Sequence, residues 1–165
     1  MDTTFQNGNY LVVDELSYRF QDPKRGDVVI FKAPPKALAL ENIDQSKTVY
    51  YIKRVIGLPG DTVQIDGDQV TISNAANPNG SVLNEPFTYF DSTVASSTTS
   101  IFENLHEKVT LGAGEYFVMG DNRHNSSDSR LWGILPINNI KGRAFVRLFP
   151  PTELSLFPRA YNFSK

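Results

Sequence analysis

The sequence contains no cysteine, only two histidines and no long run of apolar residues. Without cysteine, disulfide scaffolds, cysteine nucleophiles and thiolate metal sites are excluded. A histidine-rich metal centre is also disfavoured, because His106 and His124 are the only imidazole side chains. No segment approaches the roughly 20 apolar residues of a membrane-spanning helix, and Met1 to Thr4 do not begin a signal peptide. We expect neither a metal nor another cofactor.

The charges are nearly balanced, since 16 Lys and Arg stand against 18 Asp and Glu and the formal net charge is -2. No broad basic field exists to hold a phosphate backbone, so nucleic acid is not an expected partner. The 165 residues suffice for one compact domain with a small excursion. Many β-branched and aromatic residues, with 10 prolines and 11 glycines, favour strands and turns. We predict a mostly β protein.

Short apolar runs bounded by turn residues predict the strands. They occur at residues 10–14, 28–31, 49–56, 114–119 and 142–148. The first two runs are expected to be buried on both faces. A hairpin is predicted where two further runs flank Asp66-Gly67-Asp68, because Asp-Gly supplies the positive φ angles of a tight turn. Residues 33–47 and 73–100 are predicted to be surface segments, and the ends of the second can pair as strands.

Lys53 stands out in the longest strand, because alternation places it on the same face as Val49, Tyr51 and Val55. Two interpretations are open. A lysine at a partly wet sheet edge discourages pairing with other chains. A desolvated lysine is less readily charged, and its amine can act as a general base that deprotonates a serine.

Residues 120–133 contain two Asp, two Arg, three Ser and two Asn between an apolar strand and a tryptophan. One interpretation is a structural loop held by ion pairs and Asx turns. The other is a network that orients a catalytic side chain through Ser126 or Ser129 and the Asp128–Arg130 pair. A triad of His124, Ser126 and Asp128 is disfavoured, because three members spaced two residues apart in one loop rarely face one another.

Four segments of the chain, taken in order, resemble the extracytoplasmic catalytic domain of bacterial type I signal peptidases. These segments are residues 1–20, 25–31, 51–61 and 120–133. The most specific is the last, with Gly120-Asp121-Asn122-Arg123, then Asn125-Ser126-Ser127-Asp128-Ser129-Arg130, then Trp132-Gly133. The family consists of membrane-anchored serine proteases with a serine–lysine dyad, and the match spans nearly the whole chain.

The resemblance implies a role for several residues. Lys53 would be the general base, Ser126 would orient its amine, and Asp128 with Arg130 would shape the surrounding loop. Asp121, Asn122 and Arg123 would support the site. Tyr51 and Ile52 would line the substrate channel, with Met1 and Phe5 on the other wall of a pocket for a small P1 side chain. The peptide would add as a strand beside the lysine strand.

The resemblance places the nucleophilic serine immediately before Met1, where the sequence has no residue. The family's membrane anchor would also lie upstream. A proline is expected two places after Met1, and Thr3 stands there instead. Thr3, Thr4 and Ser17 are not expected to substitute for the nucleophile. Two interpretations are open: a chain cut just after the serine, or a natural homologue that has lost it. As given, the chain is expected to be inactive.

The resemblance also implies a fold, an activity and a location. The fold would be a coiled antiparallel, barrel-like core formed by residues 1–65 and 115–165, with residues 66–114 as a small inserted region. The full-length parent would be a monomer at the extracytoplasmic side of the cytoplasmic membrane. There it would remove signal peptides from secreted preproteins.

Two rival interpretations use the same residues. A self-cleaving domain of the type fused to damage-response repressors is disfavoured by residues 120–133 and by the turn Gly57-Leu58-Pro59-Gly60-Asp61. A non-catalytic peptide-binding homologue would keep the groove without the nucleophile. Retention of both Lys53 and Ser126 argues against that scaffold, because a buried amine is costly to keep without a use.

Overall fold

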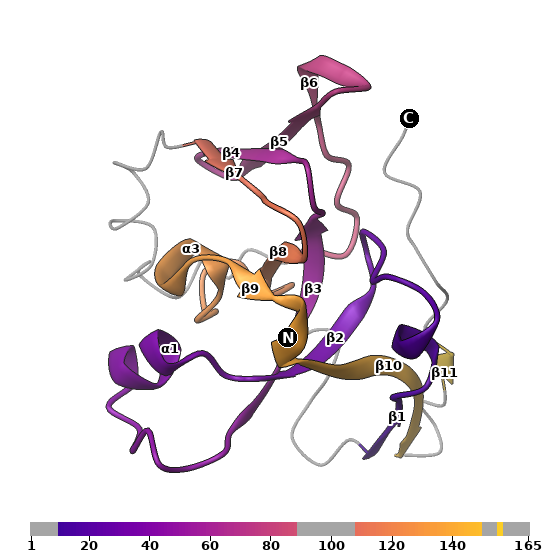
Figure 1. Cartoon of the computed structure of the whole chain (residues 1–165), viewed down its shortest axis with the longest axis vertical. Coiled ribbons are helices and arrows are strands. Elements are labelled where there is room, and N and C mark those ends of the chain that lie inside the picture. The colour runs from indigo at the N-terminus through magenta and orange to yellow at the C-terminus, as the bar shows by residue number, and fades with distance from the viewer. Residues whose placement is uncertain (1–9, 89–107, 150–154, 157–165) are drawn as a thin grey trace.

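The computed structural model of the chain describes residues 10–88, 108–149 and 155–156. Antiparallel strands dominate it and form two sheets, so the prediction of a mostly β protein is confirmed (Figure 1). Within the described residues both sheets are open. The first has β1 and β9 at its edges, and the second has β6 and β7.

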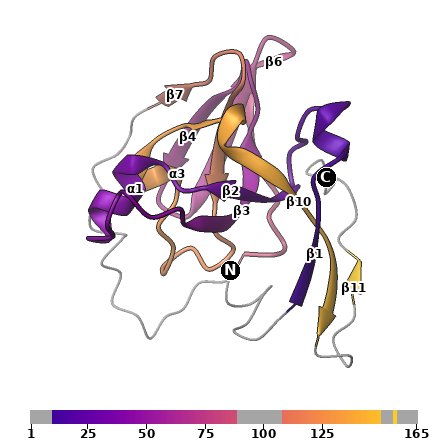
Figure 2. The ribbon, with the colours of Figure 1, turned by 60° about the horizontal axis from the view of Figure 1, so that its bottom comes forward.

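The first sheet has the order β1-β10-β2-β3-β8-β9, and β11 pairs with β10. Its strands are β1 (Tyr10–Asp14), β2 (Val28–Lys32), β3 (Tyr50–Gly57), β8 (Glu115–Met119), β9 (Leu135–Pro136), β10 (Ile140–Phe149) and β11 (Ser155–Leu156). The end of this sheet that holds β1, β10 and β11 lies on the opposite side of the molecule from the two α-helices (Figure 2).

The second sheet has the order β6-β5-β4-β7. Its strands are β4 (Thr62–Asp66), β5 (Gln69–Asn74), β6 (Asn77–Val82) and β7 (Lys108–Thr110). The predicted hairpin is β4–β5, and Gly67 takes a φ of 54° in its turn. Since β4 belongs to this sheet, the two sheets are joined at residues 58–61. The division into a core and an inserted region remains a prediction.

The helices are short. Within the described residues they are α1 (Pro35–Leu40), α3 (Ser129–Trp132) and two 3-10 turns, Ser17–Arg19 and Ile137–Asn139. Residues 33–47 were predicted to be a surface loop, but they contain helix α1. It begins at a proline, whose fixed φ suits the first helical position, and buries Ala37 and Leu38. Among the residues described here, no helix has the length and apolar character needed to cross a membrane.

The core consists of two main clusters that share strands β3 and β8. One cluster contains Val55 and Val118 beside Phe31, Tyr116 and Trp132. The other contains Ile56, Phe117 and Met119 with apolar side chains of β4 and β5. Alternate side chains of a strand point to opposite faces, so β3 and β8 supply both clusters. Strand β3, which carries Lys53, and strand β8, which leads into residues 120–133, therefore pack against apolar side chains on both faces.

Strand β1 was expected to be buried on both faces, and this was wrong. The side chains of Tyr10 and Val12 are 66% and 39% exposed. The strand lies at the edge of the first sheet and pairs with β10. The apolar run in the sequence could not distinguish this edge strand from the covered strand β2, in which Val28, Val29 and Phe31 are buried.

Candidate active site

Lys53 lies in the middle of β3, where it pairs with Val29 of β2. Its half-buried side chain shares a face with Tyr51 and Val55, as the alternation predicted. The amine Nζ lies 5.7 Å from the centroid of the Tyr51 ring. That ring packs edge-on against Phe31, with the centroids 6.1 Å apart. The lysine amine is therefore held at the rim of an apolar cluster.

Gly120 brings Lys53 and Ser126 together. A Cβ atom at Gly120 would lie 2.2 Å from Ser126 Oγ and 3.7 Å from Lys53 Cδ. The two side chains thus converge on the space that the glycine leaves open. Ser126 is buried, with 6% of its surface exposed. The role of Ser126 in orienting the Lys53 amine remains a prediction.

Asp128 is completely buried and organises the loop after β8. Its carboxylate accepts hydrogen bonds from the Gly120 amide at 3.0 Å and from Arg130 Nε at 2.8 Å. It also caps α3 by accepting from the Arg130 amide. Burial by itself would raise the pKa of Asp128, but the Arg130 charge and the hydrogen bonds outweigh it and hold the pKa below the usual 3.8. The carboxylate is therefore charged at neutral pH.

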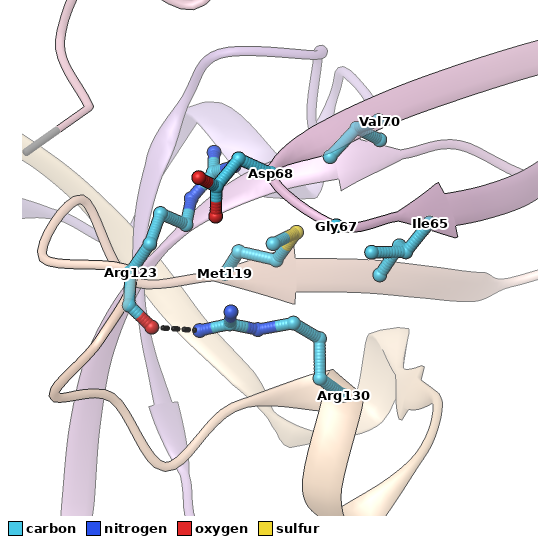
Figure 3. A pocket seen from close by; sticks show the side chains of 7 residues that line it. All are labelled: Ile65, Gly67, Asp68, Val70, Met119, Arg123 and Arg130. Atoms are coloured by element: carbon cyan, nitrogen blue, oxygen red, sulfur yellow. Dashed lines mark hydrogen bonds between the residues drawn. The ribbon is translucent and has the colours of Figure 1, made fainter. Parts of the chain in front are cut away.

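Arg130 and Arg123 extend this network around the loop. Arg130 donates to the Arg123 carbonyl oxygen at 2.7 Å, a contact drawn in Figure 3. Arg123 Nε donates to the Gly120 carbonyl oxygen at 3.2 Å. The Gly120 residue is thus hydrogen-bonded at its amide by Asp128 and at its carbonyl by Arg123. Together, these bonds fix the backbone against which Lys53 and Ser126 pack.

A small pocket separates this loop from the tip of the β4–β5 hairpin (Figure 3). It is lined by Ile65, Gly67, Asp68, Val70, Met119, Arg123 and Arg130. Nearby, His124 Nε2 lies 3.9 Å from an Asp68 carboxylate oxygen. His124 thus faces the hairpin, in keeping with the argument against a His124–Ser126–Asp128 triad.

Asp121 pairs with Arg54, a residue that sequence reasoning did not assign to the site. The Arg54 guanidinium contacts both carboxylate oxygens, at 2.8 and 2.6 Å, and donates to the Gly26 carbonyl oxygen at 2.9 Å. Both partners of this ion pair are buried. The sequence did hold a signal, because alternation puts Arg54 on an apolar face with Ile52 and Ile56, where a charge needs a partner.

Two other polar residues of the loop occupy defined places. Ser129 Oγ accepts a hydrogen bond from the Val118 amide at 3.0 Å, which ties the start of α3 to β8. Asn122 is buried, with 4% of its surface exposed.

The expected substrate-contacting residues fall into two groups. Tyr51 lies next to Lys53 on one face of β3, whereas Ile52 packs on the other face against Val28 and Ala144. Met1 and Phe5 lie outside the described residues, as does His106. Over residues 10–88 and 108–149, no group of three or more His, Asp or Glu side chains could hold a metal ion.

The fold and the site define an antiparallel β protein with a lysine and a serine converging on a glycine in a loop fixed by buried ion pairs. The family described as "Signal peptidase, peptidase S26" matches residues 1–149, and the chain belongs to this family. The resemblance inferred from the sequence is thereby confirmed.

Three curated relatives illustrate the match. The chain is 35% identical over 156 residues to the probable signal peptidase I-2 of Synechocystis sp., covering 94% of this chain and 62% of the relative. It is 39% identical over 151 residues to the signal peptidase I of Leptolyngbya laminosa, covering 92% and 65%. It is 34% identical over 155 residues to the chloroplastic thylakoidal processing peptidase 1 of Arabidopsis thaliana, covering 94% and 41%.

These three relatives are longer than the chain, which spans less than two thirds of each. Among solved structures, a signal peptidase I from Enterococcus faecalis is 28% identical, with a TM-score of 0.49. The match covers 74% of this chain and 97% of that one.

Proposed function

We propose that the chain is the catalytic part of a signal peptidase, a serine endopeptidase that removes signal peptides from preproteins after small residues. The observation that carries this proposal is the convergence of Lys53 and Ser126 on Gly120 within a buried hydrogen-bond network. Membership in the signal peptidase family supports the same activity.

Lys53 acts as the general base in this proposal. Its neutral amine takes the proton from a serine placed directly before Met1, and the serine oxygen bonds to the carbonyl carbon of the scissile peptide. The carbon–nitrogen bond breaks, and Lys53 returns the proton to the leaving amine. The Lys53 amine then takes a proton from water, whose oxygen attacks the ester carbonyl carbon. The ester carbon–oxygen bond breaks, Lys53 returns the proton to the serine oxygen, and the acyl product leaves as the acid. Ser126 orients the amine through both steps, and Asp128 fixes the loop that carries Ser126.

The substrate peptide lies in extended form beside β3. The pairing of β8 with β3 begins at Arg54. The peptide would therefore pair with the part of β3 that precedes Arg54, next to Tyr51 and Ile52. Alternate side chains of an added strand point to opposite faces. Tyr51 and Ile52 can therefore contact different positions of the peptide, with Met1 and Phe5 completing the pocket for a small P1 residue.

The same proposal includes the cellular setting that the family resemblance implies. The protein would be anchored in the cytoplasmic membrane by a segment upstream of Met1 and would act as a monomer on its extracytoplasmic side. Its partners would be the signal peptides of secreted preproteins. Curated relatives named signal peptidase I and thylakoidal processing peptidase support the role of signal peptides as partners.

Removing the lysine tests the proposal directly. In the chain with a serine placed before Met1, Lys53→Ala should lower the rate of cleavage of a preprotein-like peptide by about 10²- to 10⁴-fold, the usual contribution of a general base. Ser126→Ala should cause a smaller loss. Thermal unfolding should change little for Lys53→Ala, because the removed amine lies at the rim of the core.

Lys141→Ala is the matched control, since Lys141 is a half-exposed lysine paired with Glu15 on the surface. It should cleave at the parental rate. An unchanged rate in Lys53→Ala would overturn the assignment of the base. Binding of the peptide without any cleavage by the serine-bearing parent would instead support a peptide-binding scaffold.

A further inference from the structure

Residues 83–88, which follow β6, form a turn that contacts residues 120–133, the site loop. Leu83 remains attached to β5 through a hydrogen bond from its amide to the Val70 carbonyl oxygen at 2.8 Å. The Thr88 amide and hydroxyl both donate to the Glu85 carbonyl oxygen, at 3.1 and 2.8 Å. Pro86 occupies the second position of this turn, where its fixed φ is favourable. The segment is therefore held in place by its own backbone.

This turn presents Glu85 to Arg123 of the site loop. The two carboxylate oxygens accept from the two terminal nitrogens of the guanidinium at 2.8 and 2.5 Å. The side chains are 7% and 3% exposed, so the ion pair is almost completely buried. A bidentate pair of this kind fixes direction as well as distance. Within a segment predicted to lie at the surface, the Glu85 side chain is thus covered by its contact with Arg123.

The third nitrogen of the same guanidinium, Nε, donates to Gly120 in the catalytic centre. With its terminal nitrogens on Glu85, Arg123 directs Nε to the Gly120 carbonyl oxygen. Gly120 is the residue on which Lys53 and Ser126 converge. A continuous series of contacts thus runs from Glu85 through Arg123 and Gly120 to the lysine and serine.

We propose that Glu85 is a positioning residue that sets the geometry of Lys53 and Ser126 through Arg123 and Gly120. This proposal rests on the proposed peptidase function. A glutamine at this position offers one acceptor oxygen and turns an NH₂ group toward the guanidinium. Arg123, left with a buried uncompensated charge, would then turn toward other acceptors and release the Gly120 carbonyl.

Phe87, from the same turn, makes a second contact with a residue near Gly120. Its ring centroid lies 4.0 Å from the guanidinium carbon of Arg54, which pairs with Asp121. Asp121 directly follows Gly120 in the chain. The turn thus contacts Arg123, which donates to Gly120, and Arg54, which pairs with the residue after Gly120.

Kinetics of Glu85→Gln test the proposal in the chain that carries a serine before Met1. We expect kcat to fall about 10- to 100-fold, because small displacements of catalytic groups have effects of this size, with KM changed by less than about twofold. The acid limb of the pH profile of kcat should move to higher pH, because water entering beside Lys53 would stabilise its ammonium form. Glu85→Asp keeps the charge and should recover most of kcat.

Asn74→Ala is the control for a purely structural effect. Asn74 ends β5, in the sheet whose strand β6 leads into the Glu85 turn, and its side chain donates to Asp61 at 2.9 Å and not to the Glu85–Arg123–Gly120 contacts. We expect it to lower the melting temperature while leaving kcat and the pH profile unchanged. If Glu85→Gln behaves like Asn74→Ala, with kcat per folded molecule intact, the positioning role is overturned.

Hydrogen exchange separates this proposal from the proposed function. In Glu85→Gln the loss of the bond from Arg123 to the Gly120 carbonyl should loosen the loop and weaken the bond from the Gly120 amide to Asp128, so this amide should exchange about tenfold faster. Amides of β4 and β5 should keep their rates. If the serine-bearing parent cleaves nothing, the peptidase function fails, whereas unchanged exchange at Gly120 overturns the linkage from Glu85.

Discussion

At the scale of single residues, the site depends on the absence of a side chain at Gly120. A methyl group there would lie 2.7 Å from Ser126 Cβ, besides its contact with Oγ. Real carbon atoms do not approach so closely without bonding, so the serine or the loop backbone would have to move. The glycine is therefore required for the approach of Ser126 to Lys53.

We predict that Gly120→Ala lowers kcat of the serine-bearing chain by about 100-fold, since a displacement near 1 Å has effects of this order. Gly112→Ala is the matched control, because a Cβ there would meet only the flexible end of the Glu115 side chain, at 3.1 Å. Steady-state cleavage of a preprotein-like peptide compares the two. Full activity in Gly120→Ala would show that Ser126 tolerates displacement and that its contact with Lys53 is not needed.

From the sequence, Lys53 was selected because it is a charged residue in an apolar strand. Ser126 and Asp128 were selected because they lie in an unusually polar segment between an apolar strand and a tryptophan. Sequence reasoning missed Arg54 and Glu85 because their partners are remote in the chain. Asp121 lies 67 positions from Arg54, and Arg123 lies 38 positions from Glu85. Arg54 stands out on an apolar face of its strand, but the sequence does not identify its partner, and Glu85 lies among polar neighbours, so only the folded arrangement reveals both ion pairs.

At the scale of elements, local signals predicted what local chemistry determines. The β4–β5 hairpin follows from an Asp-Gly turn between alternating strands. Helix α1 could not be predicted in this way, because it is stabilised by the burial of Ala37 and Leu38 and by contact with α3. That helix lies almost 90 residues later by the numbering. The exposure of β1 is likewise set by its edge position and not by its apolar sequence.

The corner after β1 contains a carboxylate that makes stability depend on pH. Asp14 accepts hydrogen bonds from the Ser17 hydroxyl and amide and from the Leu16 amide, and it pairs with Arg143 of β10 at 3.3 Å. The Ser17 hydroxyl and amide outweigh partial burial and, with Arg143 and the Leu16 amide, lower the pKa of Asp14 from 3.8 to about 2. The resulting stabilisation is present above pH 3.8 and is lost as the pH falls toward 2.

Asp14→Asn should therefore destabilise the protein by about 1 kcal/mol near neutral pH, the usual net value of such hydrogen bonds. The difference from the parent should shrink as the pH falls from 3.8 to about 2. Urea unfolding at several pH values measures it, and Ser17→Ala should show a smaller difference over the same range. A difference that stays constant down to pH 2 would contradict the role given to the Asp14 charge. The pKa of Asp128 is lowered in the parent and in Asp14→Asn alike, so Asp128 does not contribute to the difference between them.

At the scale of the whole molecule, Asp61 joins the two sheets. It is 3% exposed and accepts from Arg25, which precedes β2, at 2.8 Å and from Asn74 at the end of β5 at 2.9 Å. Its carboxylate also accepts from the Leu58 amide at 2.7 Å and so closes the connection between β3 and β4. One carboxylate therefore connects the segment before β2, the turn after β3 and the end of β5, and so links the two sheets.

We predict that Asp61→Ala costs about 3 kcal/mol of unfolding free energy, because it leaves three donors without their acceptor and breaks a largely buried ion pair. Glu15→Gln, which removes a half-exposed ion pair with Lys141, is the control and should cost no more than about 0.5 kcal/mol. Urea unfolding should remain a single transition in both variants, because β3 and β8 supply side chains to both core clusters. Two separate transitions in Asp61→Ala would show that the sheets are independent, and the second sheet could then not hold the site loop in place.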